Sequence, residues 1–130
     1  MLCQVLLAEE HSNIILAKYT TNNKYYAIKI YNKLDVVESD LVDNIMNEIT
    51  TMKSFSNNDN LVNLKFCFTS ETHIYIGMDF LQGGNLSTKL SKDKILDEED
   101  AKRYAAQILK GLQAIHSQNR IYRALEPKHV

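Results

Sequence analysis

The apolar residues of this 130-residue chain change their spacing near residue 40. Before that point short runs alternate, as in residues 25–31, where every second side chain falls on one face of an extended strand. After it Leu41, Ile45, Ile49 and Met52 recur at spacings of four, four and three, which marks one face of a helix. Strands followed by helices predict an α+β fold with its own core.

Five strands are expected, at residues 4–7, 14–19, 25–31, 64–69 and 74–79. The polar residues 21–24 join the second and third strands in a hairpin. One helix is inserted before the fourth strand, and Ser39 or Asp40 is available as its N-cap. The sequence thus predicts five strands with one inserted helix, followed by further helices.

The second part of the chain is predicted to be helical. A connector with Gly83-Gly84 leads into a short helix at residues 86–90. Asp97 caps a long helix that ends near Ser117. The apolar stripe of this long helix consists of Ala101, Tyr104, Ala105, Ile108, Leu112 and Ile115.

Charge and cysteine content exclude several protein classes. Fifteen basic side chains nearly balance sixteen acidic ones, which argues against a nucleic-acid binder. No apolar run reaches the roughly 18–20 residues of a membrane span, and the N-terminus lacks a basic segment typical of a secretory signal. Cys3 and Cys67 stand in apolar surroundings, so we expect buried free thiols in the reducing cytoplasm.

Four landmarks together resemble the eukaryotic protein kinases. Tyr26-Ala27-Ile28-Lys29 is similar to their A-x-K strand, and Glu48 follows Lys29 by nineteen residues on a helix, as the paired glutamate of the family does. Residues 78–86 resemble the gatekeeper and hinge, and residues 116–130 resemble the catalytic loop. Tyr122 and the hinge favour the cyclic-nucleotide-regulated, AGC-like Ser/Thr kinases.

The resemblance implies a partial kinase domain over residues 1–130. Residues 1–80 would form the small lobe, a five-stranded antiparallel sheet with one helix. Residues 81–86 would form the hinge, and 87–130 the first helices and catalytic loop of the large lobe. Lys29 alone reads as an exposed strand lysine, but Glu48 at the family spacing favours an ion pair. The resemblance assigns these nucleotide-binding positions: Leu6, Ile14, Ala27, Lys29, Glu48, Met78, Asp79, Leu81 and Leu86. Ile14, Ala27 and Leu86 would be core in any fold.

The phosphate-binding turn departs from the family. Gly and Pro are absent from the first 76 residues, and the three glycines of the G-x-G-x-x-G loop fall on Leu7, Glu9 and Ser12. Side chains there keep backbone N–H groups away from phosphates. Glu9 and Glu10 also add negative charge near the expected polyphosphate, so we expect at most weak ATP binding.

The catalytic loop departs further. Ala124 stands where the family has its catalytic Asp, Glu126 replaces a Lys, and His129 replaces the metal-binding Asn. We expect His129 to be a disordered terminal side chain rather than a ligand. The D-F-G metal segment does not occur in these 130 residues, so we expect no Mg²⁺ site.

Three functional interpretations follow. The first is a truncated, catalytically inactive kinase-like domain with an ATP-site remnant. The second is a regulatory pseudokinase that binds a partner protein through the helix edge at Met52 or through the exposed long helix, with no role for nucleic acid or membrane. The third is a fragment of a longer kinase.

Overall fold

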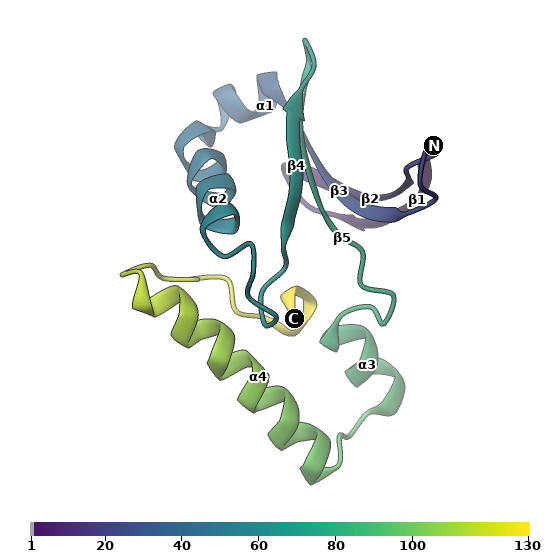
Figure 1. Ribbon diagram of the computed structural model, residues 1–130, viewed down its shortest axis with the longest axis vertical. Helices are drawn as coiled ribbons and strands as arrows, with labels where there is room; N and C mark the ends of the chain where they lie inside the picture. The colour runs from purple at the N-terminus through teal and green to yellow at the C-terminus, as the bar shows by residue number, and fades with distance from the viewer. Residues whose placement is uncertain (1) are drawn as a thin grey trace. The chain divides into compact units, whose positions relative to one another are not determined.

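The computed structural model describes residues 2–130, with side chains from Gln4 onward (Figure 1). The chain forms two compact units, and each is described by itself. The first extends to Asn57 and includes Val62–Phe80, and the second comprises Asn58–Leu61 and Leu81–Val130. The expectation for Cys3 falls outside the described side chains.

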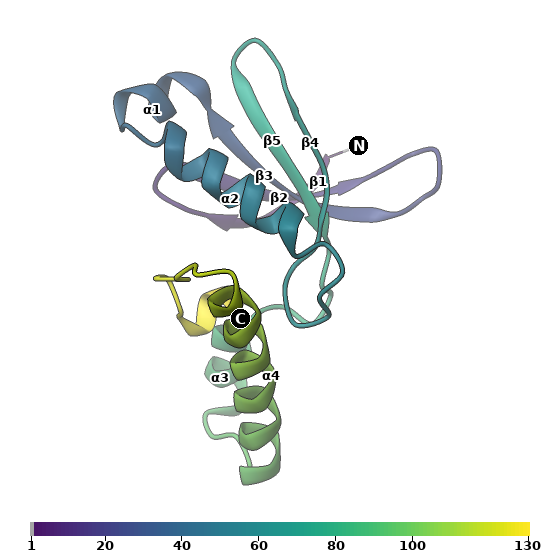
Figure 2. The same cartoon turned by 60° about the vertical axis from the view of Figure 1, so that its left-hand side comes forward.

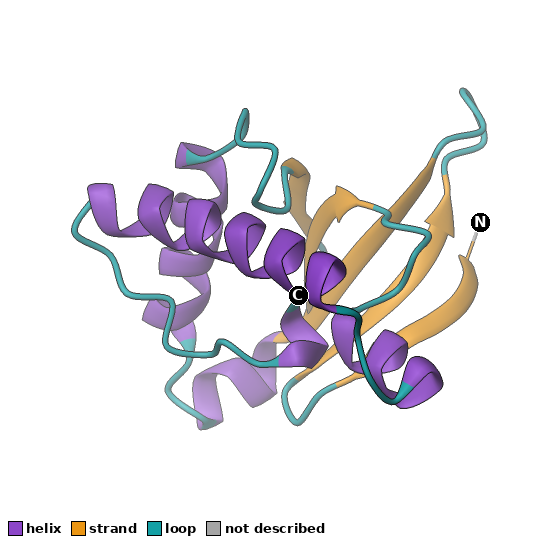
Figure 3. Ribbon diagram, turned by 90° about the horizontal axis from the view of Figure 1, so that it is seen from below, coloured by secondary structure: helices purple, strands orange, loops and turns teal. Residues whose placement is uncertain are grey.

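The first unit is built on one antiparallel sheet of five strands, which confirms the predicted fold class (Figure 3). The strand order is β1-β2-β3-β5-β4, so β1 and β4 form the edges. The strands are β1 Leu2–Ala8, β2 Ser12–Lys18, β3 Tyr25–Asn32, β4 Leu64–Thr69 and β5 His73–Asp79. Each predicted strand is present, with ends that differ by at most a few residues.

Two helices, not one, connect β3 to β4. Helix α1 spans Lys33–Glu38, and its N-cap Asn32 accepts a hydrogen bond from the Leu34 N–H. Helix α2 spans Val42–Ser54. The expected N-cap for α2 was wrong, because Ser39 ends α1 and Leu41 occupies the cap position without a side-chain hydrogen bond. Tertiary contacts therefore fix the start of α2.

The apolar stripe of α2 packs onto the sheet, as the spacing predicted. Ile45 from α2 and Val36 from α1 join Tyr31 of β3 and Ile76 of β5 in one buried cluster. Ile76 has no exposed surface. Around the cluster lie further half-buried residues, among them Leu41, Ile49, Met52, Leu64, Ile74 and Met78. Figure 2 shows α2 lying across one face of the sheet.

Cys67 contradicts the expected burial. It lies in edge strand β4 and is exposed as a free thiol. An edge strand has a neighbour on one side only, so its side chains keep more contact with solvent. Partial burial still raises the pKa of the Cys67 thiol.

The second unit consists of α3 Leu86–Asp93, α4 Glu98–Ser117 and the short 3-10 helix η1 Pro127–His129. The predicted Asp97 cap is confirmed, since its Oδ1 accepts a hydrogen bond from the Asp100 N–H at 2.7 Å. The N–H of Leu86 donates to the Val130 carbonyl at 2.8 Å and ties the start of α3 to η1. Among the described residues, no helix combines the length and the apolar character that crossing a membrane requires.

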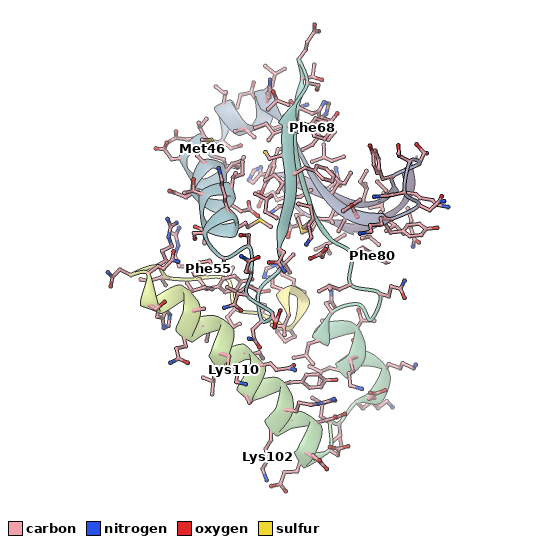
Figure 4. The ribbon with its side chains drawn as sticks, in the orientation of Figure 1. Met46, Phe55, Phe68, Phe80, Lys102 and Lys110 are labelled. Carbon is pink, nitrogen blue, oxygen red and sulfur yellow. The ribbon has the colours of Figure 1, made fainter. Side chains whose placement is uncertain are left out.

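The apolar stripe of α4 is only partly covered. Ile115 is buried, whereas Tyr104, Ile108 and Leu112 are half-buried. The two alanines expected in the stripe are exposed. On the outer side of the helix Leu109 keeps 65% of its surface in solvent. Figure 4 shows Lys102 and Lys110 projecting from the same helix.

Candidate functional site

The centre of the site is an ion pair between strand β3 and helix α2. Lys29 Nζ lies 3.0 Å from Glu48 Oε1. The side chain of Lys29 is 16% exposed and that of Glu48 is 32% exposed. The nineteen-residue spacing therefore brings the two together as the sequence predicted, at the edge of the core rather than on the open surface.

Tyr31 completes this pair, and the sequence analysis did not include it. Its hydroxyl donates a hydrogen bond to Glu48 Oε2 at 2.8 Å, so each carboxylate oxygen has its own donor. Lys29 Nζ also lies 5.1 Å from the centre of the Tyr31 ring. The signal was available, because residues two apart on a strand share a face.

The surroundings raise the pKa of both donors, Lys29 and Tyr31. Burial alone would lower the pKa of the Lys29 ammonium, but the Glu48 charge and the Tyr31 hydroxyl outweigh it and hold that pKa above its usual value. Burial and the Glu48 carboxylate raise the pKa of Tyr31 to about 12. Lys29 is therefore a fixed cation and Tyr31 a fixed neutral donor at physiological pH.

A second carboxylate reaches Lys29 from the turn between β1 and β2. Glu9 Oε2 lies 3.5 Å from Lys29 Nζ and accepts a hydrogen bond from Ser12 Oγ at 2.7 Å. The backbone N–H of Glu9 donates to the Ser12 carbonyl at 2.8 Å. Glu9 and Ser12 are two of the positions where glycines were expected, and the structure joins them to each other and to Lys29.

A hollow of about 230 Å³ opens beside this cluster within the first unit. Its walls include Glu9, Ser12, Tyr31 and Glu48. It also touches Asn44 on α2. Leu41 and Ile45 also line the hollow, so its exposed surface is more apolar than polar although carboxylates stand in its walls.

The remaining predicted positions occupy neighbouring places on the sheet. Ile14 of β2 is opposite Lys29, and Ala27 of β3 is opposite Met78 of β5, so their side chains share the face that carries the ion pair. Ala27 is buried. Leu6 on edge strand β1 is 39% exposed.

Three further positions lie where the sheet ends and the second unit begins. Asp79 closes β5, and its carboxylate lies 2.9 Å from Lys65 Nζ. Leu81 is 63% exposed, and Leu86 is the first residue of α3. Their proposed roles as hinge positions follow from the resemblance.

The sequence profile of the protein kinase domain matches residues 10–130 of this chain. The chain belongs to the protein kinase domain family. This confirms the expected family, and the match covers the ion pair, the hinge and the catalytic-loop region.

Individual relatives are serine/threonine kinases by name. The chain is 30% identical over 117 residues to serine/threonine-protein kinase Sgk1 of Xenopus tropicalis, which covers 90% of this chain and 28% of that protein. It is 33% identical over 132 residues to ribosomal protein S6 kinase alpha-1 of Rattus norvegicus, covering 99% and 18% respectively. These similarities support the expected AGC-like Ser/Thr class. The chain thus spans about a quarter or less of these relatives.

In this kinase domain the catalytic-loop region is ordered by its own local contacts. The Ala124 N–H donates to the Tyr122 carbonyl at 2.8 Å, and His129 Nδ1 donates to the Ala124 carbonyl at 2.8 Å. The expected disorder of His129 was wrong, because it lies in η1 and holds the loop. Glu126 is 2.9 Å from Lys128, a hydrogen-bonded pairing that lowers the pKa of the Glu126 carboxyl.

The kinase family uses Mg²⁺ with ATP, and His129, at the position of the family's metal-binding Asn, does not suit that ion because Mg²⁺ prefers oxygen ligands. Among the side chains from Gln4 onward, no three His, Cys, Asp or Glu residues are grouped to hold a metal. The ring nitrogen of His129 that faces the loop is already bonded to a carbonyl. No chemical step is therefore assigned to a metal here.

Proposed function

We propose that this kinase-domain chain retains part of an ATP site but does not transfer phosphoryl groups. The observation that carries the proposal is Ala124 at the position of the family's catalytic Asp. A methyl group cannot accept the proton of a substrate hydroxyl or orient that hydroxyl. We infer a catalytically defective member of the Ser/Thr kinase family.

The charges around Ala124 support the same conclusion. Glu126, at the family's Lys position, would repel a transferring phosphoryl group, which gathers negative charge on its oxygens. Lys128 lies close by, but its ammonium is 2.9 Å from Glu126 and already compensates that carboxylate. His129 is engaged with the Ala124 carbonyl. The loop thus has no carboxylate base at position 124, and its Lys128 ammonium is engaged with Glu126.

The Lys29–Glu48 pair supports the nucleotide-binding half of the proposal. In the family this lysine contacts the α- and β-phosphates of ATP, and here it keeps its glutamate partner at 3.0 Å. Without the glycine turn and without a metal-binding group, we expect weak binding that does not depend on Mg²⁺. The free thiol of Cys67 fits the reducing, cytoplasmic compartment that we propose.

A graft tests the loop directly. Residues 116–130 of this chain replace the matching segment of Xenopus tropicalis Sgk1, and peptide phosphorylation is measured. We expect kcat to fall by about 10²–10⁴-fold, the usual contribution of a positioned base. The matched control is the same graft with A124D, E126K and H129N together, which should recover most of the activity.

Two results would contradict the proposal. One is a graft that keeps near-normal kcat. The other is phosphoryl transfer from labelled ATP by the 130-residue chain itself that disappears in Lys29→Met. For nucleotide binding, the test is a thermal shift with ATP and ADP with and without Mg²⁺. A shift that requires Mg²⁺ and grows with the γ-phosphate would refute metal-independent binding.

Exposed apolar residues in the second unit favour a second function, the binding of a partner protein. Ile95 is 83% exposed, Leu109 65% and Ile121 76%. Large apolar side chains left in solvent can mark interaction sites or aggregation-prone regions. We propose that α4 and its flanking segments contact another protein, as regulatory kinase-like domains can do without catalysis.

Hydrogen exchange tests this second function. If the surface needs a partner, amides of residues 98–116 should exchange faster than those of β3 and β5 in a monomeric sample. Leu109→Glu should abolish any self-association seen by ultracentrifugation, and Lys110→Glu on the same helix is the charge control. Strong protection throughout α4 in a monomer would show that the helix is stable without a partner.

A further inference from the structure

We propose that Glu9 is a built-in anion that occupies Lys29 in place of a phosphate, so that this site selects adenine nucleosides over nucleoside polyphosphates. The inference rests on the proposed ATP-site remnant and specifies which ligand that remnant accepts. It makes Glu9 a specificity-determining residue. The lost glycines of the turn thus do more than weaken phosphate binding.

The turn that would have to open for phosphates is closed by its own hydrogen bonds. The Glu9 N–H donates to the Ser12 carbonyl at 2.8 Å, and Ser12 Oγ donates to Glu9 Oε2 at 2.7 Å. Ser12 is 5% exposed, so its hydroxyl is fixed in place. A phosphate oxygen approaching this turn finds the Glu9 backbone donor and the Ser12 hydroxyl already engaged.

The Ser12 hydrogen bond also aims the Glu9 carboxylate at the lysine. The same Oε2 atom that accepts from Ser12 lies 3.5 Å from Lys29 Nζ. On its other side Lys29 meets Glu48 at 3.0 Å. One cation therefore faces two carboxylates, and the cluster carries a net negative charge before any ligand arrives.

That charge balance decides the ligand class. A polyphosphate must displace Glu9 from Lys29 or lie beside an uncompensated carboxylate, and like charges at this range oppose binding. An uncharged nucleoside escapes that penalty because it places no anion at Lys29. Affinity should consequently fall from adenosine to ATP, the reverse of the order expected when a lysine holds phosphates.

The test compares Glu9→Gln with Glu10→Gln. Glutamine keeps the size of Glu9 and an oxygen for Ser12 but removes the charge. Glu10 is the matched control, because its side chain is 88% exposed and its nearest ionic neighbour is His11 at 3.9 Å. Adenosine, ATP and inorganic pyrophosphate, all without metal, are titrated by calorimetry and thermal shift at low salt.

We expect Glu9→Gln to bind ATP about tenfold more tightly, equivalent to about 1.4 kcal/mol, with adenosine affinity unchanged. It should also gain a pyrophosphate-induced thermal shift that Lys29→Met removes and that added salt weakens. Glu10→Gln should behave like the parent chain. Glu9→Ala serves as a second neutral variant and should match Glu9→Gln.

The pyrophosphate titration tests the role of Glu9 separately from the proposed function. If adenosine and ATP bind to none of the variants, the ATP-site remnant is refuted, and pyrophosphate still reports whether Glu9 occupies Lys29. If neither neutral variant gains ATP or pyrophosphate binding over Glu10→Gln, the role of Glu9 is refuted. A parent chain that binds ATP more tightly than adenosine would refute it as well.

Discussion

The two units of this chain reach order by different means. Among the described side chains, six of the buried apolar residues lie in the first unit and one, Ile115, lies in the second. In the first unit Ile76, Ile45, Val36 and Tyr31 form a shared core between sheet and helices. A buried core of this kind supplies most of the free energy of folding.

The second unit is held mainly by local contacts. Asp97 caps α4, and short-range ion pairs join Glu98 to Lys102 and Lys89 to Asp93. Exposed pairs of this type contribute little to the free energy of folding, because water and salt screen them. The comparison teaches that a well-capped helix can form here without the core that fixes the first unit.

The largest contrast should come from paired truncations. Ile76→Ala should lower the free energy of unfolding by about 2–5 kcal/mol, because it leaves a cavity in the core. Leu109→Ala in α4 should change it by less than about 0.5 kcal/mol, because that side chain is exposed. Urea denaturation followed by circular dichroism measures both. Equal losses would mean that the second unit also depends on Leu109 for its core.

Two glycines allow a finer version of the comparison. A Cβ at Gly77 in β5 would overlap the Phe66 ring, so Gly77→Ala should cost about 1–3 kcal/mol. A Cβ at Gly111 in α4 would lie 3.1 Å from the Asn60 carbonyl oxygen, a contact that a small shift relieves. Alanine also favours a helix by about 1 kcal/mol over glycine. Gly111→Ala should therefore be close to neutral in the same unfolding assay, and a large loss there would contradict this.

Alkaline pH should weaken the first unit in particular. Lys29 and Tyr31 both hold their protons more tightly when folded, so the unfolded chain releases them first as pH rises. The Tyr31 contribution is complete below pH 10 and is lost as the pH rises toward about 12, its folded pKa, whereas the Lys29 contribution persists to higher pH. For each proton that the unfolded chain has released and the folded chain still holds, the free energy of unfolding falls by up to about 1.4 kcal/mol per pH unit.

Tyr31→Phe isolates the tyrosine part of this effect. The variant should lose about 1 kcal/mol at neutral pH, for the missing hydrogen bond to Glu48. Its stability should then fall less steeply above pH 10 than that of the parent chain. In a pH titration followed by tyrosinate absorbance, the variant should lack the last ionisation step of the parent chain. An unchanged slope would show that Tyr31 does not carry the pH dependence.

The most local effect should come from the cap of α4. Asp97→Ala removes the acceptor for the Asp100 N–H and should cost about 1 kcal/mol, confined to the second unit. Asp97→Asn keeps an acceptor and serves as the control. Hydrogen exchange at the first turn of α4 measures the change. Faster exchange in β3 or β5 of Asp97→Ala would show that the two units are energetically coupled.

The sequence by itself determined the features that depend on local spacing. The five strands, the apolar face of α2 and the Asp97 cap follow from periodicity and capping chemistry, which act over a few residues. The Lys29–Glu48 pair could also be predicted, because an acid on the inward edge of an apolar helix face needs a partner and the family resemblance indicated Lys29 as that partner. Family membership was predicted from the same landmarks.

Tertiary structure alone decided how the polar groups meet. Leu41 starts α2 without a capping side chain because packing against the core replaces the local signal. His129 binds the Ala124 carbonyl, and Glu9 turns toward Lys29, through contacts between residues whose separation carries no periodic pattern. Such contacts depend on where the chain turns and which side chain arrives there. The charge balance at Lys29 is consequently a property of the folded β1–β2 turn, because folding brings the carboxylate within 3.5 Å of the ammonium.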